Sequence, residues 1–416
     1  MKFLVLTATI LFSLCAFNYG QEINSYNLNV KINVAKRSVE VCGDVNLNYQ
    51  GHDTVSFILW KNTNIHEIKS GGKNLIYNFD TAAKSPVIYI QNGKKLTVVR
   101  NKSKEDTGSF YFNYTCDMHD VTGWGKSFTD EWVEMGYYSA WFPVNTRSNN
   151  FTSELKVTID SGYIVSGSGI VTKENDTWKI SQPWAGFDNV IIASRDIKSR
   201  TLQEGNSKIE VVYATFSESG IDSILLTCKE AFEYYKNLYG PKDGTYMKFV
   251  LPPVESNGGG YSRKNFIVLR AKEYDLYTIR GIAHEIGHFW WHNASATTWH
   301  DWLNESFAEY SQLLFVRHKL GDKTFNELLD EYGKSSKKTP PIWGIDRARP
   351  EAYSALYEKG SLILNEFKDK IGEQKFFSFL QLLIQKDITK TNDFLNLVEN
   401  EFSVDMRNWF EKKLKS

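Results

Sequence analysis

Two short segments constrain this chain of 416 residues more than any other feature, because together they hold two imidazoles and two carboxylates at ligand spacing. The first is His284-Glu285-Ile286-Gly287-His288, and the second runs from Trp302 to Tyr310 and carries two glutamates. Residues four apart on an α-helix share one face, so His284 and His288 can reach a single ion. The fold must therefore bring a second, acid-bearing helix against this face.

These residue types point to zinc, which in catalytic sites keeps three protein ligands and one position for water. We predict one Zn²⁺ per chain, held by His284, His288 and Glu305. Glu309, one turn further, is the alternative ligand or a partner for an imidazole. Because zinc lowers the pKa of its water from 15.7 to about 7, Glu285 can take the remaining proton and return it to a leaving amine. The pattern predicts a metal-activated hydrolase.

The charge balance bears on the partners of the protein, and the first twenty residues bear on its location. Lys plus Arg equals Asp plus Glu, at 49 each, so nothing in the charge favours nucleic acid as a partner. Lys2, the apolar run from Phe3 to Phe17 and a cleavage point after Gly20 predict a signal peptide over residues 1–20. No apolar run is long enough for a comfortable membrane span. We therefore expect a secreted or periplasmic protein without stable membrane insertion.

The cysteines after this leader leave two alternatives open. Cys42 and Cys116 could form one disulfide in an oxidising compartment, with Cys228 free, or all three could be buried thiols. The spacing alone does not decide between them.

Hydrophobic periodicity divides the remaining chain into two parts. Short alternating runs typical of half-buried strands recur from about residue 22 to 200, at 26–34, 45–49, 54–60, 155–159 and 178–180. Beyond about residue 215 we expect a helix over 220–239, strands over 246–251 and 265–269, helices over 274–291 and 301–320, and helical segments to the end. We thus predict an all-β domain over 21–205 and a mixed catalytic domain over 206–416.

The two metal-binding segments resemble those of the M1 family of zinc metallopeptidases, which are gluzincins. Tyr357-Glu358-Lys359-Gly360 is similar to the family's Tyr-x-Lys-Gly segment, whose tyrosine hydrogen-bonds the tetrahedral intermediate. The resemblance implies that Tyr357 stabilises an oxyanion. Ala140-Trp141-Phe142-Pro143 and Gln182-Pro183-Trp184 loosely resemble segments of the family's β domain.

The resemblance implies an α+β multidomain fold. In it, a saddle-like all-β domain precedes a thermolysin-like mixed α/β catalytic domain with a helical C-terminal half. We expect a short form without the large C-terminal helical domain that most members carry.

Two departures from the family pattern bear on function. The stretch between His288 and Glu305 is shorter than in the family, which we interpret as a shortened loop at 293–298. Gly258-Gly259-Gly260-Tyr261-Ser262-Arg263 stands where the family's Gly-x-Met-Glu-Asn motif is expected. In the family, the glutamate of that motif anchors the free α-amine of the substrate, and this chain lacks it.

Other residues could contact the substrate in its place. Glu134 lies eight residues before Phe142, where relatives carry a second amine-binding Glu or Gln, and Glu255 precedes the glycine run. Either could instead be an ordinary surface acid. Gly258, Gly259 and Gly260 could hydrogen-bond an extended peptide through their backbone.

We therefore expect a zinc-dependent peptidase that acts on peptide substrates. Aminopeptidase action is the first expectation because it is the usual activity of the family that the chain resembles. Endopeptidase action, or exopeptidase action with altered N-terminal recognition, is the alternative because the amine anchor is missing. A zinc-containing module that captures peptides without hydrolysing them is a third reading. Ester or epoxide hydrolysis would use the same zinc.

Overall fold

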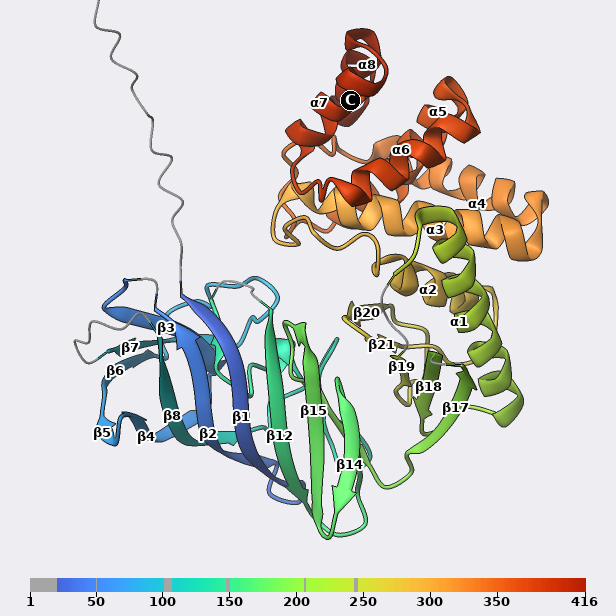
Figure 1. Ribbon diagram of the computed structural model, residues 1–416. Coiled ribbons are helices and arrows are strands. Elements are labelled where there is room, and N and C mark those ends of the chain that lie inside the picture. Colours follow the sequence, from blue (N-terminus) through green and yellow to red (C-terminus); the bar gives the residue numbers. More distant parts are fainter. Residues whose placement is uncertain (1–20, 50, 101–106, 147–149, 206, 243–245) are drawn as a thin grey trace, which may run out of the picture.

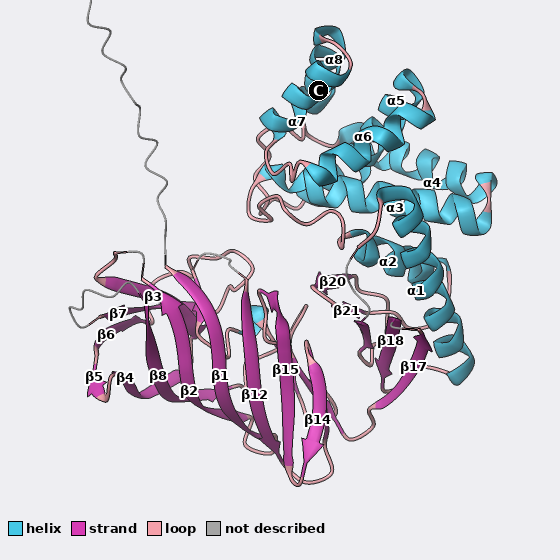
Figure 2. Ribbon diagram, in the orientation of Figure 1, coloured by secondary structure: helices cyan, strands magenta, loops and turns pink. Residues whose placement is uncertain are grey.

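The computed structural model describes residues 21–49, 51–100, 107–146, 150–205, 207–242 and 246–416 (Figure 1). The predicted signal peptide, residues 1–20, lies outside the described residues. A β-rich N-terminal half is followed by a smaller sheet and a helical C-terminal half (Figure 2). The predicted α+β multidomain fold class is thus confirmed.

Three sheets build the N-terminal half. The largest has eight strands, in the order β14 (Ile170–Glu174), β15 (Thr177–Gly186), β12 (Phe151–Ile159), β1 (Glu22–Asn33), β2 (Ser38–Asn48), β8 (Thr107–Asp117), β4 (Thr63–Ser70) and β5 (Lys73–Asn74). Strand β1 runs parallel to β12 and antiparallel to β2. Its residues alternate between buried and exposed, as the alternating sequence predicts.

Two four-stranded sheets face the same β core. One has the order β13 (Ile164–Gly167), β16 (Ile191–Ser194), β10 (Val133–Met135) and β9 (Ser127–Phe128). The other has the order β11 (Val144–Asn145), β3 (Thr54–Trp60), β7 (Gly93–Val99) and β6 (Ile76–Asp80). A single hydrophobic cluster that includes Leu28, Phe57, Phe112 and Trp141 joins strands from all three sheets and the segment around η1 (Tyr137–Ser139).

The C-terminal half begins earlier in the chain than the predicted boundary at 205. Its five-stranded sheet has the order β17 (Lys198–Glu204), β18 (Ser207–Tyr213), β19 (Tyr246–Leu251), β21 (Phe266–Leu269) and β20 (Gly260–Arg263). Strand β17 pairs along its whole length with β18, and Gly205 at the turn has a φ of 53°. Residues 198–204 therefore belong to the second sheet. Glycine suits the turn of this hairpin because it adopts a left-handed backbone conformation without strain.

Helices cover one face of this sheet and make up the rest of the chain. They are α1 (Glu218–Tyr239), α2 (Leu276–Gly287), α3 (Trp302–Leu320), α4 (Asp322–Ser335), α5 (Gly360–Ile371), α6 (Glu373–Gln385), α7 (Thr391–Glu401) and α8 (Val404–Lys415), with short turns η2 (Trp299–Asp301), η3 (Ser336–Lys338) and the π-helical η4 (Ser354–Lys359). Figure 1 shows α1 and α2 between the sheet and the remaining helices. One hydrophobic cluster joins sheet residues such as Phe249 to all eight helices.

Helix α2 is shorter than the helix predicted over 274–291. Asp275 caps its first turn by accepting a hydrogen bond from the Thr278 amide at 2.9 Å. After Gly287 the backbone bonds tighten, since the amides of Phe289 and Trp290 donate to carbonyls three residues back. The chain therefore leaves the helix just past His288 and enters the loop that leads to α3.

The structure excludes the disulfide between Cys42 and Cys116, and it buries Cys116 and Cys228 but leaves Cys42 partly exposed. Cys42 is paired with Asn113 across β2 and β8, and Cys116 with Val39, so the two cysteines stand an odd number of positions apart in the ladder. Their side chains therefore point to opposite faces of the sheet. Cys42, Cys116 and Cys228, the cysteines within the described residues, are all free thiols. Among the described helices, none has the length and apolar character that crossing a membrane requires.

Buried polar contacts join the two halves. Lys248 on β19 is 1% exposed, and its Nζ donates to the carbonyls of Gly167 and Gly169, at 2.9 and 3.0 Å. Arg263 Nε on β20 donates to Asp188 Oδ2 of the β domain at 2.7 Å. A second hydrophobic cluster spans the same junction. The two halves therefore meet through a packed interface that can hold a cleft in one shape.

Replacing Lys248 tests how far this junction stabilises the fold. Lys248→Met should lower the free energy of unfolding by about 2–4 kcal/mol at pH 7, because two buried carbonyls lose their donor. Burial lowers the pKa of Lys248 to about 8. The unfolded chain then binds more protons than the folded one between pH 8 and about 10.5, so this lysine adds stability as the pH rises. Chemical denaturation should show the wild-type advantage growing by about 1.5 kcal/mol from pH 8 to 9.5. If the difference in unfolding free energy between the wild type and Lys248→Met did not change with pH, the lowered pKa of Lys248 would be contradicted.

Candidate active site

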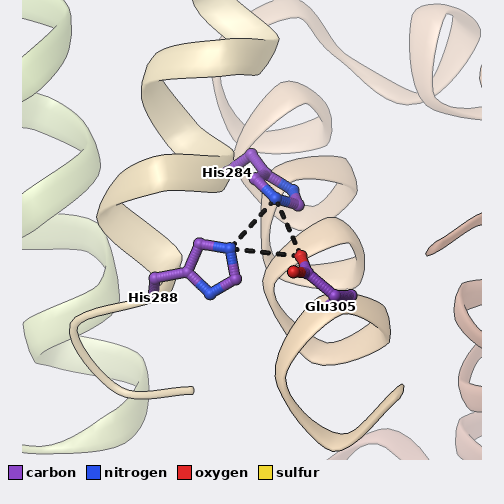
Figure 3. Close-up of side chains that lie close together, drawn as sticks. All are labelled: His284, His288 and Glu305. Atoms are coloured by element: carbon purple, nitrogen blue, oxygen red, sulfur yellow. Dashed lines mark hydrogen bonds and ion pairs between the residues drawn. The ribbon is translucent and has the colours of Figure 1, made fainter. Parts of the chain in front are cut away.

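The site lies where α2 and α3 approach most closely. A Cβ atom added to Gly287 would come within 3.2 Å of the Ala308 Cα, so a side chain at 287 would require the helices to shift by a few tenths of an ångström. This contact sets the imidazoles of α2 opposite the first turns of α3. Figure 3 shows His284 and His288 on one helix facing Glu305 on the other.

The three predicted ligands lie at distances that fit one zinc ion. His284 Nε2 and His288 Nε2 are 3.1 Å apart, and Glu305 Oε2 lies 3.4 Å from the first and 3.3 Å from the second. Tetrahedral zinc with bonds of about 2.0–2.1 Å separates neighbouring ligand atoms by about 3.3–3.4 Å. Glu305 Oε2 is buried without a hydrogen-bond partner. The triangle therefore matches a metal site in spacing, donor type and unsatisfied oxygen.

Glu309, the alternative ligand, stands behind this triangle. Its Oε2 lies 2.7 Å from Nδ1 of His284, the ring nitrogen that faces away from the other ligands. Tyr332 donates to its second oxygen, and an Arg280 nitrogen lies 3.7 Å from it. Burial alone would lower the pKa of His284, but Glu305 and Glu309 raise it well above the usual value. Glu309 thus lies against the outer nitrogen of His284, outside the group of three residues that could hold a metal ion, where it can orient the imidazole.

Glu285 lies next to the ligands on α2, buried and without a counter-ion. It is 5% exposed, and its Oε2 has no hydrogen-bond partner. A Cβ on Gly260 would lie 2.8 Å from its Oε1, so the absence of a side chain at 260 leaves room for this carboxylate. Burial raises the pKa of Glu285, while the two histidines oppose the rise. A carboxylate in this environment is suited to take and return a proton.

Tyr357 reaches the same site from the π-helical turn η4. Its ring stacks on His284, with centroids 5.6 Å apart and an angle of 10° between the planes, and on Tyr353 at 4.4 Å. A Cβ added to Gly360 would overlap Ser306 Oγ, so glycine lets this turn lie directly on α3. Burial raises the pKa of Tyr357 well above its usual value, which keeps the phenol protonated as a donor.

A cleft of about 1680 Å³ opens over these residues and is lined from both halves of the chain. The β domain contributes aromatic residues, among them Tyr89, Trp124 and Tyr138. Tyr89 also donates from its hydroxyl to the carbonyl of Ala296, at 2.6 Å, in the predicted short loop. A peptide could therefore lie between the β domain and the α2–α3 pair.

The glycine run forms one wall of the cleft. Gly259 and Gly260 line it, whereas Gly258 lies beside it and hydrogen-bonds with Arg270 in the adjoining strand segment. Strand β20, which begins at Gly260, is the edge of the five-stranded sheet. The outer side of β20 therefore has no neighbouring strand within this sheet, so an extended peptide could pair with it.

Glu134, predicted to meet a substrate amine, is placed differently. It is completely buried and does not line the cleft. Arg270 Nη2 donates to its Oε2 at 2.8 Å and the Tyr261 hydroxyl to its Oε1 at 3.1 Å. The carboxylate is thus neutralised by an arginine across the interface. Glu255, the other candidate, is exposed and lies outside the cleft lining.

Two site residues escaped the sequence analysis. Arg347 contacts both Tyr357 and Glu305, and Asp301 is a buried acid that pairs with Arg347. Asp301 lies four residues before Glu305 in the predicted helix, and this spacing, which places both on one helix face, was the signal that could have identified it. Nothing in the pattern around Arg347 singles it out.

The catalytic half matches a known family of zinc metallopeptidases. The sequence profile described as "Peptidase family M1 domain" matches residues 255–412, which include the three ligands and Tyr357. This part of the chain is therefore similar to the M1 peptidase domain, and it contains His284, His288 and Glu305, which lie close enough together to hold one metal ion.

Sequence relatives include aminopeptidases of very different sources. Aminopeptidase N of Streptomyces lividans is 24% identical over 215 residues, which cover 45% of this chain and 25% of that protein. Human endoplasmic reticulum aminopeptidase 2 is 30% identical over 113 residues, covering 24% of this chain and 12% of that protein. The chain therefore spans only a minor part of the length of these curated relatives.

Solved structures share the fold over nearly the whole chain. An M1 zinc metallopeptidase from Deinococcus radiodurans has a TM-score of 0.75 at 16% identity, covering 95% of this chain and 94% of that one. Leukotriene A4 hydrolase from Saccharomyces cerevisiae has a TM-score of 0.73 at 14% identity, covering 94% of this chain and 66% of that one. Both domains of this chain are thus arranged as in those structures.

The different placement of the two glutamates on α3 predicts different effects on zinc affinity. Glu309→Gln should weaken zinc binding by about 10–100-fold, as the loss of a residue that orients a ligand does. Glu305→Ala should weaken it further, because a ligand is lost. Competition with a chromophoric chelator measures both. Glu331→Gln, an exposed acid that also lines the cleft, should leave affinity unchanged. A larger loss in the Glu309 variant than in the Glu305 variant would reverse the assignment.

Proposed function

We propose that this protein is a zinc-dependent peptidase that hydrolyses peptide bonds in the cleft between its two halves. The carrying observation is the ligand triangle of His284, His288 and Glu305 with the unpaired, buried carboxylate of Glu285 beside it. The match of residues 255–412 to the M1 peptidase domain supports the same activity. A module that only captures peptides has no use for an unpaired buried carboxylate next to the ligands, since such a group costs stability.

The chain's own residues divide the reaction between them. When bound, zinc supplies Lewis acidity and lowers the pKa of a water molecule. Glu285 takes the proton of the attacking water and delivers it to the leaving amine, which its raised pKa favours. Tyr357 donates its phenol hydrogen to the oxygen of the scissile carbonyl as negative charge develops there. Strand β20 holds the peptide backbone in an extended form.

Aminopeptidase action is the first candidate for the mode of cleavage, because several relatives are named aminopeptidases. The position of Glu134 favours a variant of that mode with altered N-terminal recognition. In the described cleft lining near β20, Tyr261 and Arg263 stand where an amine-binding acid would be needed. Glu134, the acid predicted to bind the amine, is already paired with Arg270. A free α-ammonium would therefore find neither of the two predicted anchors, Glu134 and Glu255, in the cleft lining.

We place the protein in the periplasm or the extracellular medium, on the signal-peptide pattern of residues 1–20 alone. Edman sequencing of the protein isolated from its native host should begin at Gln21. A sequence beginning at residue 1 or 2 would contradict the leader.

Removing the general base should separate catalysis from metal binding. Glu285→Gln should retain one zinc per chain but lower kcat by about 10²–10⁴-fold, the range attributed to general acid–base catalysis. Zinc content and peptide turnover measured on the same sample would show this. Glu273→Gln, an exposed acid shortly before α2, is the matched control and should change neither. Full zinc with unchanged turnover in Glu285→Gln would contradict the proposed role.

Paired peptides with free and acetylated N-termini test the recognition of the amine. Acetylation should lower kcat/KM by less than about tenfold, because no charge-assisted bond of 1.5–3 kcal/mol is lost. Glu134→Gln should affect the two substrates equally, within about threefold. Glu131→Gln, exposed in the same segment, is the control. A loss in Glu134→Gln that is confined to free N-termini would make Glu134 the amine anchor and refute altered recognition.

A further inference from the structure

Arg347 joins three functional groups of the site from a loop between η3 and η4. Its Nε donates to Asp301 Oδ2 at 2.7 Å, and its Nη2 donates to the phenol oxygen of Tyr357 at 3.2 Å. The same nitrogen lies 3.8 Å from Glu305 Oε1. The guanidinium also lines the cleft and is 15% exposed. One side chain therefore contacts the oxyanion donor and a metal ligand.

Asp301 holds Arg347 in this position. It is 1% exposed, and its Oδ1 accepts a hydrogen bond from Asn304 Nδ2 at 2.9 Å. Asn304 also hydrogen-bonds with both the amide and the carbonyl of Ala294, which lies in the short loop 293–298. Turning Arg347 away would leave Asp301 as a buried charge without its counter-ion, which is costly. The ion pair with Asp301 thus holds the Arg347 guanidinium in its position in the site.

Fixing the guanidinium constrains the proton of Tyr357. The phenol oxygen has one hydrogen to donate, and Arg347 occupies an acceptor position on that oxygen. Stacking on His284 and Tyr353 fixes the plane of the ring. The hydrogen of Tyr357 is therefore directed away from Arg347. A cation at 3.2 Å also stabilises the negative charge that the phenol gains as it donates.

We propose that Arg347 is a positioning residue that directs the phenol hydrogen of Tyr357 at the carbonyl oxygen of the substrate and strengthens that donor in the transition state. The proposal rests on the proposed peptidase function. It differs from a purely structural role, in which the pair with Asp301 would only anchor the loop.

A double-mutant cycle separates these two roles. Arg347→Met keeps the aliphatic stem but removes the donors, and should lower kcat by about 10–100-fold with KM within threefold. In a Tyr357→Phe background the same change should cost less than about threefold, because the hydrogen to be directed is gone. Arg349→Met, in the same loop and paired with exposed Glu351, is the matched control and should leave kcat unchanged.

Binding of a phosphinic peptide gives a readout that does not depend on turnover. Its tetrahedral anion imitates the transition state, so Arg347→Met should raise its Kd by about tenfold or more while zinc content stays at one per chain. In Tyr357→Phe the further rise should be less than threefold. If Arg347→Met unfolds, Arg347→Met with Asp301→Asn removes both charges and can be measured instead.

The outcomes separate this proposal from the peptidase function. Equal losses in the presence and absence of the Tyr357 hydroxyl, or a loss that follows zinc content, would overturn the role of Arg347 and leave the peptidase function intact. A wild-type protein that cleaves no peptide would overturn the peptidase function. Phosphinate binding would still decide whether Arg347 acts through Tyr357.

Discussion

The close contact between α2 and α3 is the constraint on which the rest of the site depends. Gly287 lets the helices approach until Ala308 fills the space that a side chain would occupy. This distance allows two imidazoles on one helix to converge on one carboxylate of the other, at 3.3 and 3.4 Å. Nearly all of the first fifteen residues of α3 are buried, so the surrounding core holds this helix in place against α2. The hydrophobic core of the helical half thus sets the geometry of a polar centre.

The charges around this centre also favour a divalent cation. Four buried or nearly buried carboxylates, those of Glu285, Asp301, Glu305 and Glu309, meet two guanidiniums, those of Arg280 and Arg347. Burying an excess of two negative charges is costly unless a counter-ion is present. One Zn²⁺ supplies that charge. Each carboxylate nevertheless has a separate task, because its partners differ: a histidine for Glu309, an arginine for Asp301 and none for Glu285.

Much of the fold and of the candidate site could be predicted from local sequence patterns. Strands over 54–60 and 246–251 have the predicted bounds. The spacing of the candidate ligands within each helix is a local property that the sequence shows directly, and the two helices that carry them are in contact. The pairing of β17 with β18 across the predicted boundary was not visible, since periodicity identifies strands but not their partners. The partners of Glu134 were hidden for a similar reason, because Arg270 is 136 residues away in the chain. Arg347 likewise acquires its role only when a loop beyond α4 returns to the first turn of α3.

Anomalous diffraction at the zinc edge, from crystals of the mature protein grown with zinc, tests the central claim most directly. We expect one strong peak within about 2.0–2.2 Å of His284 Nε2, His288 Nε2 and a Glu305 oxygen. Glu309 should remain on Nδ1 of His284, and Glu285 should face the open position without touching the ion. A peak ligated by Glu309 or Glu285, or no peak between α2 and α3, would contradict it.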